Sequence, residues 1–296
     1  MEDADFERKL YDVLGREWGA QVGSVTILPG GMNSRTAAIV TPAGRFVAKW
    51  VRPEDRAALL RGAQTAQLMT DHGIRAGAPV TSSGGDLTVE FSGGALALLE
   101  EVVGSPLSAS PEDQTAWGTA LAAVHAAQPR SPGSSFYGWL VDSAADPIHP
   151  PWVRSAVIRV YTEYMQLPPV TWTLLHTDPE PEAFLRDDRG DIGVIDWAGS
   201  VPGPALFDLA SAVMYAGGEA RAQALLVAYA NAGPVSPEEM LAHLRTFSRL
   251  RAAVQADYFS RRLTQRDLTG VESDDDNDKG LRDAQEMLTS LGVPLG

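Results

Sequence analysis

Two aspartates that each follow a short apolar run constrain this chain more than any other feature. Asp178 comes after Leu174-Leu175, and Asp196 comes eighteen positions later, directly after Ile195. Between them, a turn signal at 187–190 separates two predicted strands, which favours a β-hairpin. Such a hairpin would hold both carboxylates near each other, where they suit general-base chemistry and divalent-metal binding. Alternatively, each aspartate is only a turn or cap residue.

The composition narrows the class of protein. The 296 residues can bury a full core as one large domain or two lobes, and 44% hydrophobic with 21% charged residues is typical of a soluble globular protein. The chain has no cysteine, which excludes disulfides and thiolate zinc sites. Its net charge of −14 argues against a nucleic-acid partner and is compatible with a cationic substrate. Without a signal peptide or a long apolar run, we expect a cytoplasmic protein with no membrane partner.

The first hundred residues show a strand pattern with a glycine turn and an isolated lysine. Gly30 and Gly31 separate the first two predicted strands, and Lys49 lies in the third, between Ala48 and Trp50. Because glycine lacks Cβ, backbone N–H groups of such a turn can approach phosphates, although ordinary hairpins use the same pattern. An inward-facing ammonium needs an anion, which nucleotide phosphates would supply. On an edge strand, the lysine would instead point to water.

Helical patterns dominate after about residue 104. Predicted helices over the whole chain are 5–18, 53–73, 111–127, 152–166, 208–215, 219–232, 236–263 and 280–291. The segment 128–151 is predicted to be an irregular loop, and the acidic segment around 272–278 a solvated loop. The segment 198–204, rich in glycine and proline, is also predicted to be a loop. We interpret His125 as a buried core histidine, and Asp208 as a residue that opens or caps a helix.

The order of these features resembles the aminoglycoside phosphotransferase family, the small-molecule kinases that share the protein-kinase fold. The family's catalytic and metal loops follow the pattern His-Gly-Asp, four residues, Asn, a short hairpin, and Ile-Asp-Trp or Ile-Asp-Phe. His176, Asp178 and the run Ile195-Asp196-Trp197 match this pattern. Thr177 replaces the family's glycine, and Ala183 replaces its metal-binding asparagine. The later run Phe207-Asp208-Leu209-Ala210 also resembles a family signature.

The resemblance extends over roughly residues 20 to 260. It implies an α+β, two-lobed, protein-kinase-like fold. The small N-terminal lobe would be an antiparallel β-sheet with one main helix, and the larger C-terminal lobe would be mainly helical. We expect residues 1–103 to bind the nucleotide and residues 104–296 to hold the catalytic and metal loops and the acceptor site.

The resemblance also implies an ATP-dependent phosphotransferase that moves the γ-phosphoryl group to a hydroxyl of a small molecule, with ATP and Mg²⁺ as cofactors. Asp178 would be the catalytic base, and Asp196 would hold the metal. Glu182 or Glu180 could supply the metal contact that Ala183 cannot. The residues that would bind the nucleotide are Gly30, Gly31, Asn33, Ser34, Lys49, Glu100 and Val102, the last two through backbone groups that face adenine.

Two departures from the family pattern leave a second function open. Ala183 has no oxygen for a metal, and the helix at 53–73 has Gly62 or Ala63 where the family has a glutamate that pairs with the strand lysine. The chain could therefore be a catalytically impaired relative that binds a nucleotide or another ligand without turnover. Aminoglycosides, choline, homoserine, sugars and fructosamine-like compounds all stay open as acceptors, and so does the oligomeric state.

Overall fold

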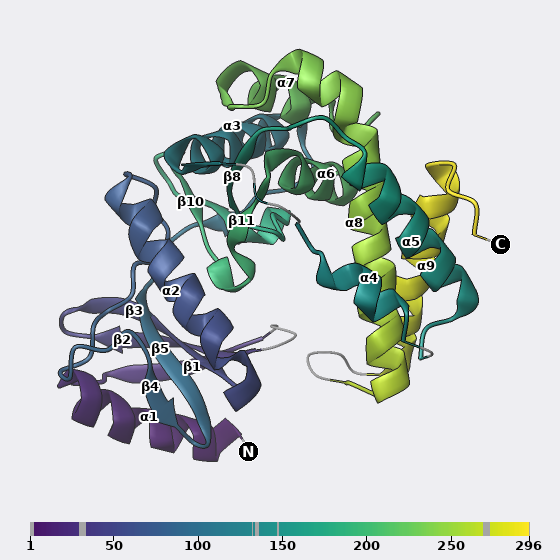
Figure 1. Ribbon diagram of the computed structural model, residues 1–296. Coiled ribbons are helices and arrows are strands. Elements are labelled where there is room, and N and C mark those ends of the chain that lie inside the picture. Colours follow the sequence, from purple (N-terminus) through teal and green to yellow (C-terminus); the bar gives the residue numbers. More distant parts are fainter. Residues whose placement is uncertain are drawn as a thin grey trace. The chain divides into compact units, whose positions relative to one another are not determined.

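The computed structural model describes residues 3–29, 34–131, 133, 136–146, 148–268 and 273–295. The chain divides into two compact units (Figure 1). Unit 1 comprises Met1–Pro106 and Glu182–Ser200, and unit 2 comprises Leu107–Pro181 and Val201–Gly296. The predicted phosphate-binding residues Gly30, Gly31 and Asn33 lie outside the described residues.

A five-stranded antiparallel sheet in the order β1-β2-β3-β5-β4 forms the centre of the described part of unit 1. Its strands are β1 (Ser24–Leu28), β2 (Ser34–Thr41), β3 (Gly44–Val51), β4 (Val89–Phe91) and β5 (Gly94–Glu100). β3 pairs with β2 on one side and with β5 on the other, and Lys49 lies opposite Thr36 and Ala97. Lys49 therefore lies on an interior strand, and the alternative of an edge strand is wrong.

Two helices cover the two faces of this sheet, as Figure 1 shows. α1 (Asp3–Trp18) packs a stripe that includes Phe6 and Leu10 into one buried cluster with Ala48 of β3. α2 (Arg56–Asp71), which follows the 3₁₀ turn η1 (Pro53–Asp55), packs Leu59 into a second cluster with Val51. Because side chains alternate along a strand, Lys49 points to the face that α2 covers.

The predicted hairpin is part of unit 1. It consists of β9 (Phe184–Arg186) and β10 (Ile192–Val194), flanked by the 3₁₀ turns η2 (Pro181–Ala183) and η3 (Trp197–Gly199), and β9 also pairs with β6 (Ser105–Pro106). The turn between its strands is closed by the Gly190 N–H, which donates to the Asp187 carbonyl at 3.0 Å. The Val194 N–H donates to the Arg75 carbonyl at 2.8 Å, which attaches the hairpin to the segment after α2.

Helix α2 lies directly on the backbone of η3. A Cβ atom built on Gly62 would lie 3.0 Å from both the nitrogen and the Cα of Ala198. Real Cβ contacts are seldom this short, so only glycine allows the helix to approach the turn so closely. Gly62 is one of the two positions where the family has its glutamate, and a glutamate there would have no room.

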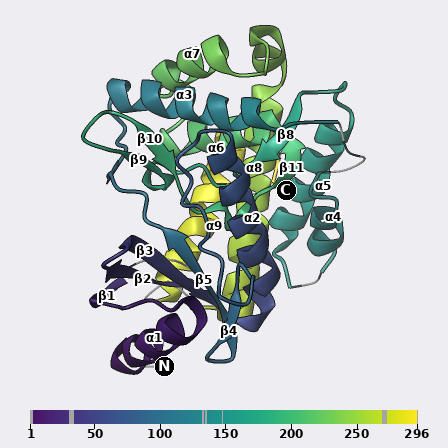
Figure 2. The ribbon, with the colours of Figure 1, turned by 90° about the vertical axis from the view of Figure 1, so that its left-hand side faces the viewer.

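Unit 2 is mainly helical. Its helices are α3 (Pro111–Ala127), α4 (Trp139–Ala144), α5 (Pro151–Met165), α6 (Ala205–Tyr215), α7 (Gln223–Ala232), α8 (Pro237–Gln265) and α9 (Asp274–Ser290). α7 packs along α3 and α9 packs along α8, as Figures 1 and 2 both show. A small sheet in the order β11-β8-β7 joins β8 (Trp172–Leu175) to β7 (Pro129–Arg130) and β11 (Val201–Pro204).

The structure corrects four sequence expectations in unit 2. The loop predicted at 128–151 contains α4. The loop predicted at 198–204 contains β11, which pairs with β8. The acidic residues from Asp274 onward form the first turn of α9, where negative charge stabilises the positive helix end. Asp208 does not cap α6, because that helix already begins at Ala205.

Strand β8 does not join the β9–β10 hairpin, so Asp178 and Asp196 follow strands of different sheets. The two aspartates also belong to different compact units. Their approach to one nucleotide stays a prediction, and so does the division of roles between residues 1–103 and 104–296. None of the helices within the described ranges is long and apolar enough to cross a membrane.

The close packing at Gly62 predicts a penalty for any side chain there. The substitution Gly62→Ala should lower the free energy of unfolding by about 1–2 kcal/mol, because the overpacking cost exceeds the gain in helix propensity. Gly15→Ala in α1 is the matched control, since its Cβ would meet no atom closer than 3.9 Å. Urea unfolding should show Gly15→Ala equal to or more stable than the parent chain; a Gly62→Ala variant of parental stability would contradict the packing account.

Candidate functional site

The centre of the candidate site in unit 1 is an ion pair. The Lys49 Nζ lies 2.6 Å from the Asp196 Oδ1. The lysine side chain is 14% exposed and the aspartate side chain 57% exposed, so the ammonium is largely covered while the carboxylate stays accessible. A covered ammonium with one accessible counterion suits a polyanion, because phosphate oxygens can replace or extend the carboxylate contact.

Asp196 owes its position to the residues on either side. Its backbone has φ of 66°, in the left-handed region that aspartate tolerates better than most residues. The buried Trp197 fixes the segment directly after Asp196. Its indole N–H lies within hydrogen-bond distance of the Val194 carbonyl at 3.0 Å and the Ala76 carbonyl at 3.2 Å. The carboxylate is therefore held at the end of β10 by backbone geometry rather than by a flexible loop.

Glu182 and Ala183 border the same position. The Ile195 N–H donates to the Ala183 carbonyl at 2.9 Å, which extends the β9–β10 hairpin by one pair. Glu182 and Asp196 flank this bonded pair on the same side of the hairpin. Ala183, at the position of the family's asparagine, has a buried side chain. Of its two neighbours in the chain, Glu182 carries a carboxylate, and this residue is exposed.

This arrangement fits a magnesium ion bound together with a nucleotide. Mg²⁺ in nucleotide sites takes one or two carboxylates and completes its ligands with phosphates and water. Asp196 offers an accessible carboxylate, and the exposed Glu182 directly precedes Ala183, whose carbonyl accepts the N–H of the residue before Asp196. Within the described ranges, no three His, Cys, Asp or Glu side chains form a group that could hold a metal.

The segment predicted to contact adenine follows β5. Glu100 is the last residue of that strand, and its N–H donates to the Ala78 carbonyl at 2.9 Å. Gly77, with φ of 68°, passes so close that a Cβ there would lie 3.2 Å from the Glu100 carbonyl oxygen and 3.5 Å from the Val102 side chain. The adenine contacts of Glu100 and Val102 stay predictions. Ser34 begins β2 opposite Val51.

A cavity of about 280 Å³ lies next to this segment. Its lining residues are Thr70, Gly73, Ile74, Arg75, Ala76, Gly77, Glu100, Glu101 and Val102. Neither Lys49 nor Asp196 is among its lining residues, so the cavity is distinct from the ion pair of these two residues.

In unit 2, Asp208 organises the loop that carries Asp178. Its side chain is fully buried and accepts the His176 N–H at 2.7 Å and the Thr177 N–H at 2.8 Å, one on each carboxylate oxygen. The His125 Nε2 lies 3.1 Å from the same carboxylate, and the His125 Nδ1 lies 2.7 Å from the Tyr229 hydroxyl. The interpretation of His125 as a buried core histidine is confirmed, and this core supports the loop of the predicted base.

Thr177 occupies the position of the family's glycine in a conformation that glycine favours. Its φ is 76°, which costs a β-branched residue roughly 1–3 kcal/mol. The hydrogen bond to Asp208 offsets part of this strain, and the Thr177 side chain also hydrogen-bonds Tyr137. Burial raises the pKa of Tyr137 to about 12, so this phenol stays protonated at neutral pH.

Asp178 follows directly and has two side-chain partners on other helices. The Tyr215 hydroxyl donates to the Asp178 Oδ1 at 2.5 Å, and the Arg251 Nη2 lies 3.3 Å from the same oxygen. Burial raises the pKa of Tyr215, so its hydroxyl keeps the proton that it donates. Tyr215 and Arg251 orient the Asp178 side chain, which is still 59% exposed.

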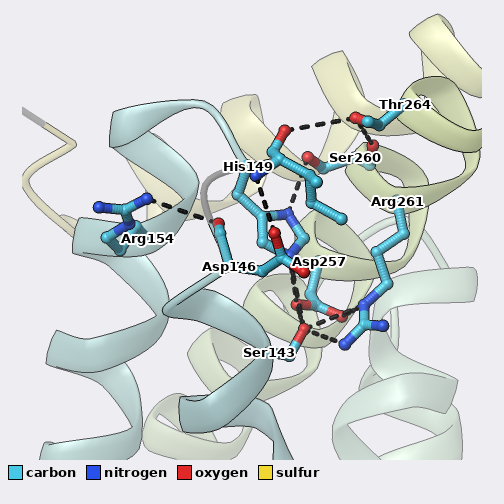
Figure 3. Close-up of polar contacts among 9 residues, drawn as sticks. Ser143, Asp146, His149, Arg154, Asp257, Ser260, Arg261 and Thr264 are labelled. Carbon is cyan, nitrogen blue, oxygen red and sulfur yellow. Dashed lines mark hydrogen bonds and ion pairs between the residues drawn. The ribbon is translucent and has the colours of Figure 1, made fainter.

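A buried polar network holds α4 against α8 in the same unit (Figure 3). The Asp257 carboxylate contacts the Ser143 hydroxyl, the His149 Nε2 at 3.3 Å and the Arg261 Nε at 3.1 Å. The His149 Nδ1 lies 2.9 Å from the Ser260 hydroxyl. Burial lowers the pKa of His149, an effect that the Arg261 charge supports and the Asp257 charge opposes. The network fixes the end of α4 through Ser143, and Trp139 is the first residue of the same short helix.

The model of the phosphotransferase enzyme family (APH) matches residues 24–243. The chain belongs to this family. Membership identifies it as a small-molecule phosphotransferase and confirms the resemblance to the aminoglycoside phosphotransferases that the sequence motifs carry. No curated protein shows significant sequence similarity to the chain.

Solved structures similar to this phosphotransferase include small-molecule kinases. An amicoumacin kinase in complex with AMP-PNP, Ca²⁺ and Ami is 15% identical with a TM-score of 0.74, over 96% of this chain and 93% of that one. The choline kinase LicA from Streptococcus pneumoniae is 18% identical with a TM-score of 0.71, over 97% and 99%. Spectinomycin phosphotransferase APH(9)-Ia with ADP and spectinomycin is 12% identical with a TM-score of 0.70, over 97% and 98%. This likeness confirms the predicted α+β, protein-kinase-like fold.

The sequence motifs of this phosphotransferase did not indicate Tyr215, Arg251 or Tyr137 as site residues. One signal was available for Arg251, because it is a charged residue between the buried positions Leu250 and Ala252 of α8. Nothing in the local sequence of Tyr215 or Tyr137 indicates contact with the Asp178 loop, because both contacts join segments far apart in the chain.

The role of Asp208 predicts that its charge stabilises the loop of Asp178. The substitution Asp208→Asn would place an amide N–H₂ against backbone N–H donors and should lower the free energy of unfolding by about 3 kcal/mol. Hydrogen exchange of the His176 and Thr177 amides should speed up even where the variant is folded. Asp283→Asn, which removes a surface ion pair with Lys279, is the control and should stay within about 0.5 kcal/mol of the parent. Unchanged exchange at both amides would show that Asp208 does not hold the loop.

Proposed function

We propose that this phosphotransferase moves the γ-phosphoryl group of ATP to a hydroxyl group of a small molecule. The observation that carries the proposal is the 2.6 Å pair between Lys49, on an interior strand, and Asp196, at the end of the β9–β10 hairpin. A largely covered ammonium beside an accessible carboxylate is what a metal-bound triphosphate requires. Relatives of similar fold are described in complex with ADP or with AMP-PNP and Ca²⁺.

In this proposal, Asp178 orients the acceptor hydroxyl and takes its proton. The hydroxyl oxygen forms a bond to the γ-phosphorus as the bond between that phosphorus and the β,γ-bridging oxygen breaks, and ADP leaves. Tyr215 and Arg251 keep the Asp178 carboxylate aimed at one direction. Catalysis of this kind depends mainly on positioning and charge stabilisation, and proton transfer adds a smaller factor.

The remaining residues bind and neutralise the nucleotide. Lys49 contacts the α- and β-phosphates, and Asp196 holds the metal with Glu182 as the second carboxylate. Bound Mg²⁺ supplies positive charge to the phosphate oxygens. The backbone groups of Glu100 and Val102 contact adenine, and the segment with Gly30, Gly31, Asn33 and Ser34 covers the phosphates. In this proposal, residues 1–103 bind the nucleotide, and residues 104–296 carry the catalytic loop, the metal loop and the acceptor site.

Two observations favour a second candidate, a relative that binds a nucleotide without turnover. The buried Ala183 offers no metal ligand, and the close contact of Gly62 with η3 leaves no room for the glutamate that would pair with Lys49. Lys49 nevertheless has a carboxylate partner, because Asp196 lies beside it. The pair supports nucleotide binding in both candidates, and only turnover separates them.

The proposal predicts ADP release from Mg-ATP in the presence of hydroxyl compounds. Asp178→Asn should lower kcat by about 10²-fold or more, because it removes the proton acceptor, and should leave the thermal stabilisation by Mg-ATP intact. Asp196→Asn should abolish the Mg²⁺-dependent part of that stabilisation. Asp283→Asn is the control for both assays. Stabilisation by Mg-ATP without turnover would favour the second candidate, and no stabilisation at all would refute both.

A further prediction concerns the missing asparagine. If Glu182 or Glu180 supplies the second metal contact, the double variant Glu180→Gln/Glu182→Gln should lose Mg²⁺-dependent activity. Each single variant should raise the Mg²⁺ concentration needed for half-maximal rate in proportion to that glutamate's contribution to metal binding. Glu286→Gln, on the exposed face of α9, is the matched control. A double variant with the parental Mg²⁺ dependence would show that Asp196 binds the metal without help from this loop.

A further inference from the structure

We propose that the acceptor of this phosphotransferase carries an anionic group, a carboxylate or a phosphate, close to the hydroxyl that is phosphorylated. Arg251 would bind that anion. The inference rests on the proposed function in one respect, since it takes Asp178 as the group that receives the hydroxyl proton. The inference goes beyond the proposed function by naming the charge of the acceptor.

The first observation is the fixed guanidinium next to Asp178. The Arg251 side chain is 12% exposed, and its Nε donates to the Ser211 hydroxyl at 3.1 Å. Its Nη1 donates to the Gln255 side chain at 3.4 Å, and its Nη2 lies 3.4 Å from the Tyr215 hydroxyl and 3.3 Å from Asp178. A cation that is positioned before the ligand binds spends little entropy on recognition, and its hydrogen bonds to an anion are charge-assisted.

The second observation is the sign of the charges around this position. An ammonium group beside the reacting hydroxyl would have to lie near the Arg251 guanidinium, and like charges at such distances repel. The carboxylates whose charges act on the Tyr215 hydroxyl include Asp178 and Glu180. The proposed function uses Asp178 for the proton and considers Glu180 for the metal. Asp208 and Asp257 are buried and engaged in the networks described above.

The third observation concerns the aromatic residues next to the loop. Tyr137, which hydrogen-bonds Thr177, lies 5.5 Å from Trp139 between ring centroids, and Trp139 is 49% exposed. The Arg261 guanidinium lies 5.9 Å from the Trp139 ring and is held by Ser143 and Asp257 (Figure 3). An exposed indole beside an arginine suits the apolar or planar body of an anionic molecule.

The test uses probes that differ only in the group beside the hydroxyl. Mandelate, mandelamide and 2-amino-1-phenylethanol share a phenyl ring and carry a carboxylate, a carboxamide and an ammonium group. Glycerate, glyceramide and 3-amino-1,2-propanediol form the same series without the ring. Measured as ADP release, kcat/KM in each series should be at least about tenfold higher for the carboxylate than for the amine, the size expected of a charge-assisted hydrogen bond.

Variants separate recognition of the anion from support of Asp178. Arg251→Gln should reduce kcat/KM for the carboxylate and bring its ratio to the amide near one, whereas Arg251→Lys should keep part of the preference. Asp142→Asn, which changes the exposed carboxylate of α4, is the control and should leave all ratios unchanged. Equal loss for all three probes in Arg251→Gln would mean that Arg251 only positions Asp178, and a parental preference for the amines would overturn the proposal outright.

The inference can fail separately from the proposed function. If no probe supports turnover, thermal shift of the parental chain with each probe, in the presence of AMP-PNP and Mg²⁺, still measures acceptor binding. Stabilisation by the carboxylates and not by the amines, lost in Arg251→Gln, would support an anion site in a protein without turnover. Stabilisation by the amines alone, or by no member of either series, would overturn the proposal, whether or not the protein binds or hydrolyses the nucleotide.

Discussion

The ion pair between Lys49 and Asp196 is the interaction on which the account of this protein depends. The Lys49 side chain lies on the sheet face that α2 covers and is only 14% exposed, so its charge needs a partner close by. The carboxylate that serves as this partner ends the β9–β10 hairpin, which joins a segment far along the chain to the N-terminal sheet. The pair therefore links the sheet to the hairpin and leaves the Asp196 carboxylate largely exposed.

The loops that contain Asp196 and Asp178 each have a non-glycine residue whose backbone adopts the left-handed conformation. Asp196 and Thr177 have φ of 66° and 76°, and both are held by groups that the surrounding fold supplies. Trp197 anchors the first loop through backbone carbonyls, and Asp208 anchors the second through backbone N–H groups. Strain of this kind persists only where neighbouring contacts outweigh it, so the fold determines the direction of both carboxylates.

Much of the fold around the candidate site could be predicted from sequence, because it repeats local patterns, whereas the roles of the site residues stay predictions. The helix at Pro111–Ala127 and the turn at 187–190 follow from proline, glycine and aspartate placement. The short strand β11 could not be predicted, because its stability comes from pairing with β8 rather than from its own residues. The partners of Asp178 were missed for a similar reason, since Tyr215 and Arg251 approach it only through tertiary packing.

The central claim is that Lys49, Asp196 and Asp178 act on one metal-bound triphosphate. A crystal structure with AMP-PNP and Mn²⁺ tests it most directly, because manganese gives an anomalous signal that locates the ion. The account predicts a manganese peak within bonding distance of the Asp196 carboxylate, phosphates on Lys49, and the Asp178 carboxylate facing the γ-phosphate. A nucleotide bound elsewhere, or a metal with no contact to Asp196, would contradict it.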